Sequence, residues 1–152
     1  MVKFKAIAAA ALLAVSGSAF ADGSLGMLDE TGSNFADMVG AGGFSDNWTF
    51  SLATLSDVEG GGFTSPRIAG VGVALWMGGM PTGMEDGNIK DGFSFMGLAA
   101  GNYSLVFAGF STGAGTYGGN VFATPVPEPE TYAMMLAGLA AVGFLARRRR
   151  NG

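Results

Sequence analysis

The apolar residues in the middle of the chain come in short bursts that are separated by Gly, Asp, Asn, Ser and Thr. In residues 48–55 they alternate with polar residues, so that Trp48, Phe50 and Leu52 share one face of an extended strand. Residues 68–76 form a longer, mostly apolar run, which is typical of a strand that is covered on both faces. Both patterns predict β-strands.

Three further bursts follow towards the C-terminus. Residues 93–97 and 103–107 alternate between aromatic or aliphatic and smaller residues, and residues 121–124 form a short apolar stretch after the turn-rich segment 111–120. Residues 98–102 contain Gly and Asn, which tolerate positive φ angles, and they predict a hairpin turn between two of these strands.

The bursts combine into one mostly β domain over residues 22–124, which we expect to be an antiparallel β-sandwich with a jelly-roll-like arrangement. A domain of about 100 residues can bury a core without disulfides. The expected core consists of the apolar residues on the inward faces of the strands: Trp48, Phe50, Leu52, Ile68, Val71, Val73, Leu75, Phe93, Phe95, Leu98, Tyr103, Leu105 and Phe107.

Residues 1–21 have the three parts of a secretory signal peptide. Lys3 and Lys5 supply a positive start, a short apolar run follows, and small residues lead to Ala19 and Ala21, which fit signal peptidase. A buried Ala-rich helix is the alternative, but the charge, length and cleavage pattern together favour a signal peptide. We therefore expect export by the Sec machinery, cleavage by signal peptidase, and a mature chain that begins at Asp22.

The C-terminus contains an uncharged apolar stretch followed by a basic block. Residues 132–146 would extend about 22 Å as a helix, which is less than the ~30 Å hydrocarbon core, so bilayer thinning and extended arginine stems would have to make up the difference. A core helix would need a polar face, which this stretch lacks. We expect a transmembrane helix, stopped by a cytoplasmic tail, 147–152, that contains Arg147, Arg148, Arg149 and Arg150.

Residues 125–131 join the domain to the predicted transmembrane helix. Pro127 and Pro129 have restricted φ angles, and they disfavour the α conformation at Val126 and Glu128, which precede them. We therefore expect an extended, solvated strip just above the membrane, which is a shape that the cleft of a processing enzyme can hold.

These three parts together resemble the PEP-CTERM sorting signal of Gram-negative bacteria. The motif Val126-Pro127-Glu128-Pro129, the apolar span and the arginine block occur in the required order. The resemblance implies that an exosortase, a membrane-embedded cysteine transpeptidase-like enzyme, recognises this chain as a substrate. It also implies a transient stay in the inner membrane, with the domain in the periplasm, before the protein reaches the cell surface or extracellular matrix.

Two blocks in the middle of the chain resemble the FxDxF-type PEP-CTERM proteins. The first has Phe44, Asp46 and Phe50 in the spacing Phe-x-Asp-x-x-x-Phe, and the second runs through residues 93–105. This resemblance implies a β-rich secreted domain that is associated with exopolysaccharide-producing and biofilm-forming bacteria. It supplies no catalytic residue.

The composition excludes several kinds of chemistry. The chain contains no Cys and no His, which removes disulfides, thiol nucleophiles, Ser-His-Asp catalysis and most zinc sites. From Asp22 to Pro125 there are ten acidic residues against two bases, Arg67 and Lys90, and such a surface repels phosphate backbones. We expect no enzymatic activity, no cofactor and no binding of nucleic acid.

The acidic loop with Asp86, Asn88 and Asp91 presents oxygen atoms of the kind that calcium binds. The spacing of an EF-hand and its closing Glu are absent, so we favour a solvated turn over a calcium site. The alternative roles of Asp46 are to bind a cation or a sugar hydroxyl, or to accept backbone N–H groups where its strand begins, and the structural role is favoured.

Aromatic residues can stack on sugar rings. Trp48 and Tyr103 fall on predicted core faces, and Tyr117, which lies in a Gly-rich turn, is therefore a better ligand candidate than either. The leading hypothesis is an exported, sorted surface or matrix protein without catalytic activity, for which exopolysaccharide is a candidate partner. The alternative is a secreted module that binds carbohydrate or calcium, and an enzyme comes third.

Overall fold

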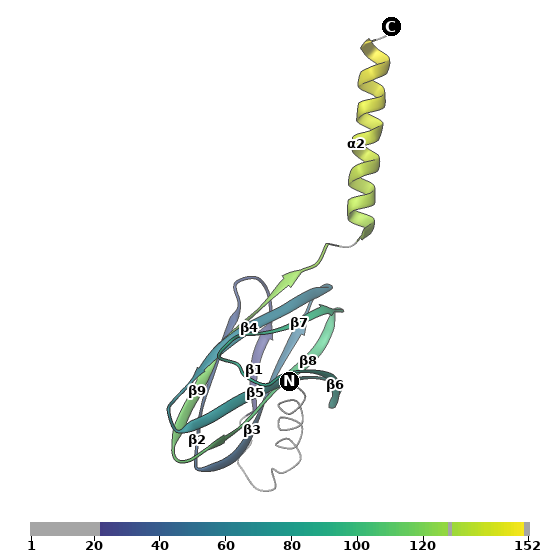
Figure 1. The fold of residues 1–152 in the computed structure, drawn as a ribbon. Coiled ribbons are helices and arrows are strands. Elements are labelled where there is room, and N and C mark those ends of the chain that lie inside the picture. The colour runs from purple at the N-terminus through teal and green to yellow at the C-terminus, as the bar shows by residue number, and fades with distance from the viewer. Residues whose placement is uncertain (1–21, 128, 151–152) are drawn as a thin grey trace.

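The computed structural model describes residues 22–127 and 129–150 (Figure 1). The predicted signal peptide with Ala19 and Ala21 lies outside the described residues, as do Glu128 and the last two residues. The elements are β1 (Asp22–Met27), β2 (Ser33–Val39), β3 (Gly42–Leu52), β4 (Ser56–Thr64), β5 (Ile68–Met77), β6 (Met80–Asp86), β7 (Phe93–Leu98), β8 (Gly101–Ser111), β9 (Gly115–Pro125) and the helix α2 (Pro129–Arg150).

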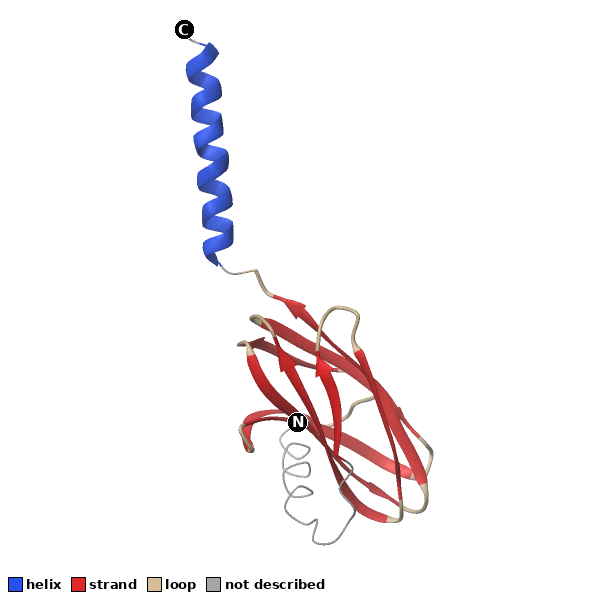
Figure 2. Ribbon diagram, turned by 180° about the vertical axis from the view of Figure 1, so that it is seen from behind, coloured by secondary structure: helices blue, strands red, loops and turns tan. Residues whose placement is uncertain are grey.

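The strands form two sheets that face each other (Figure 2). The five-stranded sheet has the order β1-β3-β8-β5-β6, and the four-stranded sheet has the order β2-β9-β4-β7. Strand β1 runs parallel to β3, whereas the other pairs of neighbouring strands are antiparallel. The prediction of a mostly β, antiparallel sandwich is confirmed.

The strand pairing is nested, as in a jelly roll. Strand β2 pairs with β9, β3 with β8, β4 with β7, and β5 with β6. The chain therefore resembles one long hairpin whose tip lies between Met77 and Met80, and the coiling of this ribbon brings β5 beside β8 and β4 beside β9. Gly78 and Gly79 both have positive φ angles (59° and 80°), as a two-residue turn at such a tip requires.

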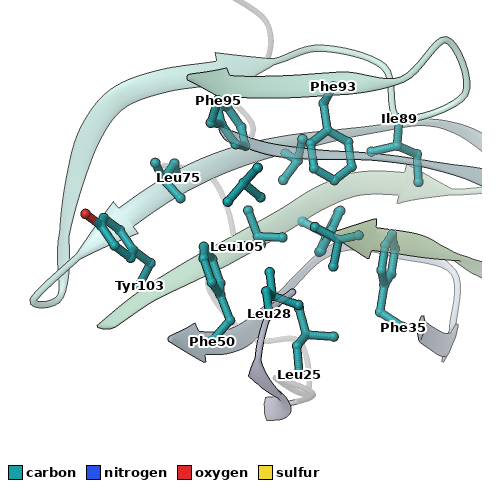
Figure 3. Close-up of a cluster of buried hydrophobic side chains, with 14 of the residues drawn as sticks. Leu25, Leu28, Phe35, Phe50, Leu75, Ile89, Phe93, Phe95, Tyr103 and Leu105 are labelled. Carbon is teal, nitrogen blue, oxygen red and sulfur yellow. The ribbon is translucent and has the colours of Figure 1, made fainter. Parts of the chain in front are cut away.

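The core lies between the two sheets (Figure 3). All the predicted core residues are buried except Trp48, which is partly buried and packs against the core; its ring lies over Gly23 of β1, where any side chain would overlap it. The ring of Phe35 in β2 stacks on that of Phe107 in β8 at a centroid distance of 4.4 Å, which joins the two sheets. The sequence prediction missed the following buried apolar residues: Leu25, Leu28, Phe35, Val39, Phe44, Val58, Ala74, Ile89, Val106, Ala108, Tyr117, Val121 and Ala123.

Several expected elements differ from the structure. Residues 98–102 do not form a hairpin turn, because β7 and β8 belong to different sheets and this segment crosses between them. The segment 111–120 is a turn only in its first part, since β9 already begins at Gly115. The four-stranded sheet covers one face of β5, and the small residues Gly72 and Ala74 occupy its other face. The prediction also missed β1, β2, β4 and β6.

The glycines of the four-stranded sheet explain why its strands were hard to find. Strands β4 and β9 approach so closely that a Cβ atom at Gly119 would overlap the carbonyl oxygen of Gly61, and one at Gly62 would lie 2.5 Å from the Gly118 oxygen. Close backbone approach of this kind needs residues without side chains. A run such as Gly60-Gly61-Gly62 carries little hydrophobic pattern, so β4 is not visible as a strand in the sequence.

Helix α2 is longer than the predicted span at both ends. It begins at Pro129, which suits the first helical position because its missing N–H would have no partner there, and Glu130 favours the positive end of the helix dipole. Its 22 residues extend about 33 Å, but this length includes Glu130 and the arginines 147–150, so the apolar stretch 132–146 remains shorter than the hydrocarbon core. The helix projects away from the sandwich and buries none of its membrane-length window against it (Figure 1).

Candidate functional site

The junction between β9 and α2 is the first candidate site. Strand β9 pairs with β4 up to Pro125, and the backbone N–H of Val126 then donates to the carbonyl oxygen of Leu55 at 2.9 Å. Neither Pro125 nor Pro127 has an N–H group, so the prolines prevent the sheet from extending regularly along this segment. The Val126 contact is therefore the last backbone anchor between the described sandwich and the tail.

The connection from this anchor to the helix is short. Only Pro127 and Glu128 separate Val126 from Pro129, and three Cα–Cα steps span at most about 11 Å. The end of the sandwich that carries Leu55 is therefore held close to the start of α2. The expected extended strip over residues 125–131 is correspondingly shorter in the structure, because Pro129, Glu130 and Thr131 belong to the helix.

The two ends of α2 differ in chemistry. Tyr132 is half exposed near the first turn, and an amphipathic ring is favoured at a membrane–water interface. The helix then presents apolar side chains on all sides, and Arg147, Arg148 and Arg149 are exposed in its last turns. Residues 129–149 are long and apolar enough to cross a membrane, with a mean hydropathy of 1.3 in their most apolar window.

Residues 125–150 match the family described as "PEP-CTERM protein-sorting motif". The tail is a PEP-CTERM motif. This confirms the resemblance seen in the sequence, whereas the FxDxF subtype stays a prediction. The PEP-CTERM motif implies an exported protein that is recognised by an exosortase, a membrane enzyme, and that passes through a membrane-anchored state.

The sandwich resembles two solved structures. One is PliG from Aeromonas hydrophila, a periplasmic inhibitor of g-type lysozyme, with a TM-score of 0.50 and 10% identity over 70% of this chain and 100% of that chain. The other is the pre-peptidase C-terminal domain of a Bacillus anthracis collagenase, with a TM-score of 0.48 and 20% identity over 70% of this chain and 99% of that chain. At these identities the likeness concerns the fold alone. A comparison with curated protein sequences gives no match.

A buried polar contact in the core of the sandwich involves Asp46 and Tyr117. Asp46 alternates inward on β3 with Phe44 and Phe50, and its carboxylate oxygen Oδ2 accepts the hydroxyl group of Tyr117 at 2.6 Å. Both residues are buried, with exposed fractions of 1% and 0%. The structural role favoured for Asp46 is consistent with this position, although its partner here is a tyrosine hydroxyl at mid-strand and not a backbone group at the strand entry.

The prediction that Tyr117 lies in a turn and is free to stack on a ligand is wrong. Its ring stacks on Phe44 at 5.3 Å between centroids. Burial raises the pKa of its hydroxyl above the usual value, and the hydrogen bond and negative charge of Asp46 raise this pKa further. The nearby Trp48 indole N–H acts in the opposite direction and lowers the pKa of the Tyr117 hydroxyl, although this N–H does not meet the geometry of a hydrogen bond. The sequence signal that could have revealed β9 is its alternation at Tyr117, Val121 and Ala123, interrupted by glycine.

The acidic loop between β6 and β7 has a structural function that the sequence did not reveal. Ile89 is fully buried, its N–H donates to the Val71 carbonyl oxygen in β5, and its own carbonyl oxygen accepts the Gly62 N–H in β4. One loop residue thereby connects the two sheets. The connection positions the loop by packing and backbone hydrogen bonds.

The calcium candidates lie around this anchor. The Asp86 carboxylate accepts the N–H of Asn88 at 2.8 Å, and the Asn88 side-chain oxygen accepts the N–H of Lys90 at 3.2 Å. Such local contacts are typical of turns that Asp and Asn stabilise. No group of three or more His, Cys, Asp or Glu residues gathers at a metal-binding distance within the described part of the chain. A solvated turn stays the favoured interpretation of Asp86, Asn88 and Asp91, and calcium binding stays its untested alternative.

Of the other acidic residues, Asp57 accepts the N–H of Gly97 at 2.7 Å, and this contact joins β4 to β7. Glu59, which follows it on the same strand, faces Ser94 and Phe122 of the neighbouring strands. The first residue is engaged in holding the four-stranded sheet together, and the second lies on a solvated face. Both carboxylates lie two positions apart on β4, on the same face of the four-stranded sheet.

Proposed function

We propose that this protein is exported, held briefly in the inner membrane by α2, processed by an exosortase at its PEP-CTERM tail, and released as a non-catalytic component of the cell surface or extracellular polymer layer. The observation that supports this most strongly is the motif at residues 125–150, in which a helix of membrane length ends in an arginine block. A self-contained sandwich precedes this tail, and its strands need no contribution from the helix.

The chemistry of the tail supports the order of these steps. An arginine block resists transfer through lipid, so translocation stops with the arginines on the cytoplasmic side. The helix then holds the Pro-Glu-Pro strip at the outer surface, where α2 begins at Pro129. A membrane enzyme that cuts near this strip would release the sandwich and leave the helix in the bilayer.

The chemistry of the sandwich supports a non-catalytic role. The chain has no Cys or His, and the most buried carboxylate, Asp46, is held in the core by the Tyr117 hydroxyl. Catalysis by paired carboxylates needs a cleft with a set separation between them, whereas Asp57 already accepts the N–H of Gly97 across the four-stranded sheet. The excess of acidic residues between Asp22 and Pro125 favours solubility of a released domain.

The test is to delete the exosortase gene in the host and to follow where the protein accumulates and with which mass. The expected result is a secreted form that lacks residues 1–21 and the arginine block in the parent strain, and a membrane-bound form that keeps the block in the deletion strain. A secreted form that keeps Arg147 in the parent strain, or an unchanged location in the deletion strain, would contradict sorting.

The role in the polymer layer needs a separate experiment. In a strain that lacks this protein, the amount of polysaccharide retained on washed cells should fall, and a copy of the gene with an intact tail should restore it. A copy that lacks residues 126–152 serves as the control, because it leaves the sandwich in place but removes the sorting signal. Equal retention in all strains would contradict a matrix role while leaving sorting unaffected.

A further inference from the structure

The outer face of the five-stranded sheet carries a shallow groove of about 430 Å³. It lies over β1, β3 and β8, and the tip of the β5–β6 hairpin, Gly78 and Gly79, borders it. Its polar lining residues on β3 and β8 alternate with the core residues Phe50 and Tyr103, so the polar side chains lie on the face of the sheet opposite the core. The lining residues are Ser24, Gly26, Met27, Thr49, Phe50, Ser51, Gly78, Gly79, Asn102, Tyr103 and Ser104.

The strand register arranges the outward side chains of the groove in two rows. Ser24, Thr49 and Ser104 are direct neighbours across β1, β3 and β8, and they form the first row. Met27, Ser51 and Asn102 form the second row across the same strands. Neighbouring strands lie about 4.8 Å apart, so each row spreads its groups evenly across the sheet.

Most of the polar groups in these rows are available to a ligand. Thr49 donates its hydroxyl to the Gly23 carbonyl oxygen at 3.3 Å, and Ser24 Oγ accepts the Gly26 N–H at 3.3 Å, which orients these two residues. The side chains of Ser51, Asn102 and Ser104 make no hydrogen bond with any other described residue of the chain. A polar side chain on a sheet face is ordinarily solvated, but here three unengaged ones share a depression.

The chemistry of the groove lining favours an uncharged ligand. It contains hydroxyl and amide groups, which both donate and accept hydrogen bonds, and no charged side chain occurs among the described lining residues. Met27, whose exposed fraction is 66%, adds an apolar surface at the edge. Neutral donors and acceptors beside an apolar surface match a sugar, whose hydroxyl groups are neutral and whose ring has apolar C–H faces. An anionic ligand would find no cation here.

We propose that this groove binds a short stretch of an uncharged polysaccharide. The two glycines at the hairpin tip have no side chains to close the groove, so a chain can enter and leave along its length. The volume lies within the range of small-molecule sites, and its open, hydroxyl-lined form is suited to weak binding that is repeated over many copies of the protein. This inference concerns the sandwich alone, and it does not depend on how the tail is processed.

The proposal is tested by calorimetric titration of the full-length protein in lipid nanodiscs. The ligands are uncharged tri- and tetrasaccharides of glucose, galactose, mannose and N-acetylglucosamine, with trigalacturonate as the anionic comparison. At least one uncharged ligand should bind, and trigalacturonate should not. Absence of binding by every uncharged ligand up to about 10 mM, well above a millimolar Kd, would overturn the proposal, as would binding of trigalacturonate alone.

Paired variants then locate the site. Ser51→Ala with Asn102→Ala removes two unengaged polar groups of the groove and should weaken binding by about tenfold. The matched control is Ser94→Ala with Asn120→Ala, which removes the same two types of side chain from the outer face of the four-stranded sheet. An equal effect of both pairs, or no effect of the groove pair, would overturn the assignment. Equal melting temperatures of both pairs ensure that folding is not the cause.

Discussion

At the scale of single residues, the most consequential contact is the buried hydrogen bond between Asp46 and Tyr117. A buried polar group is costly unless it is hydrogen-bonded, and here the Tyr117 hydroxyl provides a partner for the carboxylate between the two sheets. The bond joins β3 of one sheet to β9 of the other, so it also orients the sheets. Conserving the size of the ring while removing its hydroxyl should therefore disturb the fold.

The substitution Tyr117→Phe is expected to lower the free energy of unfolding by about 1–3 kcal/mol, because the buried carboxylate loses a donor. The control is Tyr103→Phe, which removes a hydroxyl that donates to the Ala99 carbonyl oxygen at a less buried position. Its effect should be smaller. Denaturation with urea measures both changes, and an equal loss of stability in the two variants would contradict the special role of the Asp46 contact.

The same contact predicts a dependence on alkaline pH. The pKa of Tyr117 is raised in the folded protein, so above pH 10, near the usual pKa of tyrosine, the unfolded chain loses a proton that the folded chain keeps. Stability is thus fully present below about pH 10 and falls by about 1.4 kcal/mol per pH unit above it. The stability of Tyr117→Phe should fall less steeply between about pH 10 and 11 in urea denaturation. Parallel slopes would contradict the shift.

At the scale of elements, the sequence of α2 suits a lipid bilayer and not water. It has no polar face along its apolar stretch, and none of the side chains in its membrane-length window is buried against the sandwich. In water such a helix would expose its apolar surface on all sides, whereas in a bilayer its backbone hydrogen bonds are satisfied internally. Its contribution is therefore anchoring and not domain stability.

The substitution Leu139→Arg places a charge near the middle of α2 and should cost about 3 kcal/mol of insertion free energy. The expected result is loss of the precursor from the membrane fraction after alkaline extraction. Leu139→Ile keeps the position apolar and serves as the control. Equal retention of both variants in the membrane would show that α2 is not the anchor.

The junction before α2 predicts how accessible the tail is to processing. The Val126 N–H is bonded to Leu55, so the strip must leave the sandwich before an enzyme can hold it in an extended form. Insertion of a flexible Gly-Ser segment between Pro125 and Val126 removes this cost, which is that of one hydrogen bond. Processing should accelerate by about two- to tenfold in pulse-chase labelling.

The control for this prediction is the same insertion in the connection between β2 and β3, at Gly40, which lengthens the chain without touching the tail. Its processing rate should equal that of the original protein. If the insertion at Pro125 slowed processing instead, the folded end of the sandwich would be part of what the enzyme recognises, and the opening argument would be wrong.

At the scale of the whole molecule, nested pairing makes the fold depend on its last strand. Strand β9 lies between β2 and β4 in the four-stranded sheet, and it is also the last strand before the tail. The sheet is incomplete until β9 has crossed the membrane, and pairings between segments so distant in sequence form slowly. Completion of the sandwich therefore cannot precede the arrival of β9, which comes directly before α2.

Truncation shows which part of the chain the fold needs. A chain that ends after Thr112 lacks β9 and should be unfolded, since β2 and β4 lose their shared neighbour. A chain that ends after Val126 lacks only the tail and should keep its melting temperature within a few degrees, because the sandwich buries none of the membrane-length window of α2. Circular dichroism and limited proteolysis distinguish the two, and a folded chain without β9 would contradict this dependence.

The strands that alternation predicted were those with large inward residues. The run from Ile68 and the alternation at Phe93 and Tyr103 each correspond to a strand, because burying large apolar side chains outweighs local preferences there. The glycine-rich strand β4 and the start of β9 were missed. In these segments close packing between backbones, as at Gly119, replaces side-chain pattern as the reason for a strand.

The candidate sites also divide into those that a local sequence pattern reveals and those that it does not. The tail was readable from the sequence because its properties are local: an apolar stretch without charge, two restricting prolines and an arginine block act in order along the chain. The pairing of Asp46 with Tyr117, the loop anchor at Ile89 and the two rows of the groove each join residues from separate strands. No local pattern encodes which strands become neighbours.

The sequence by itself thus determined that the tail is a PEP-CTERM motif with a helix of membrane length, since partition between water and lipid depends on summed composition over a short segment. It also determined that the middle of the chain would be β-rich, because period-two alternation is local as well. Only the tertiary structure decided that Tyr117 is a core residue and that Ser51 and Asn102 share a groove, because nested pairing sets the neighbours of each strand.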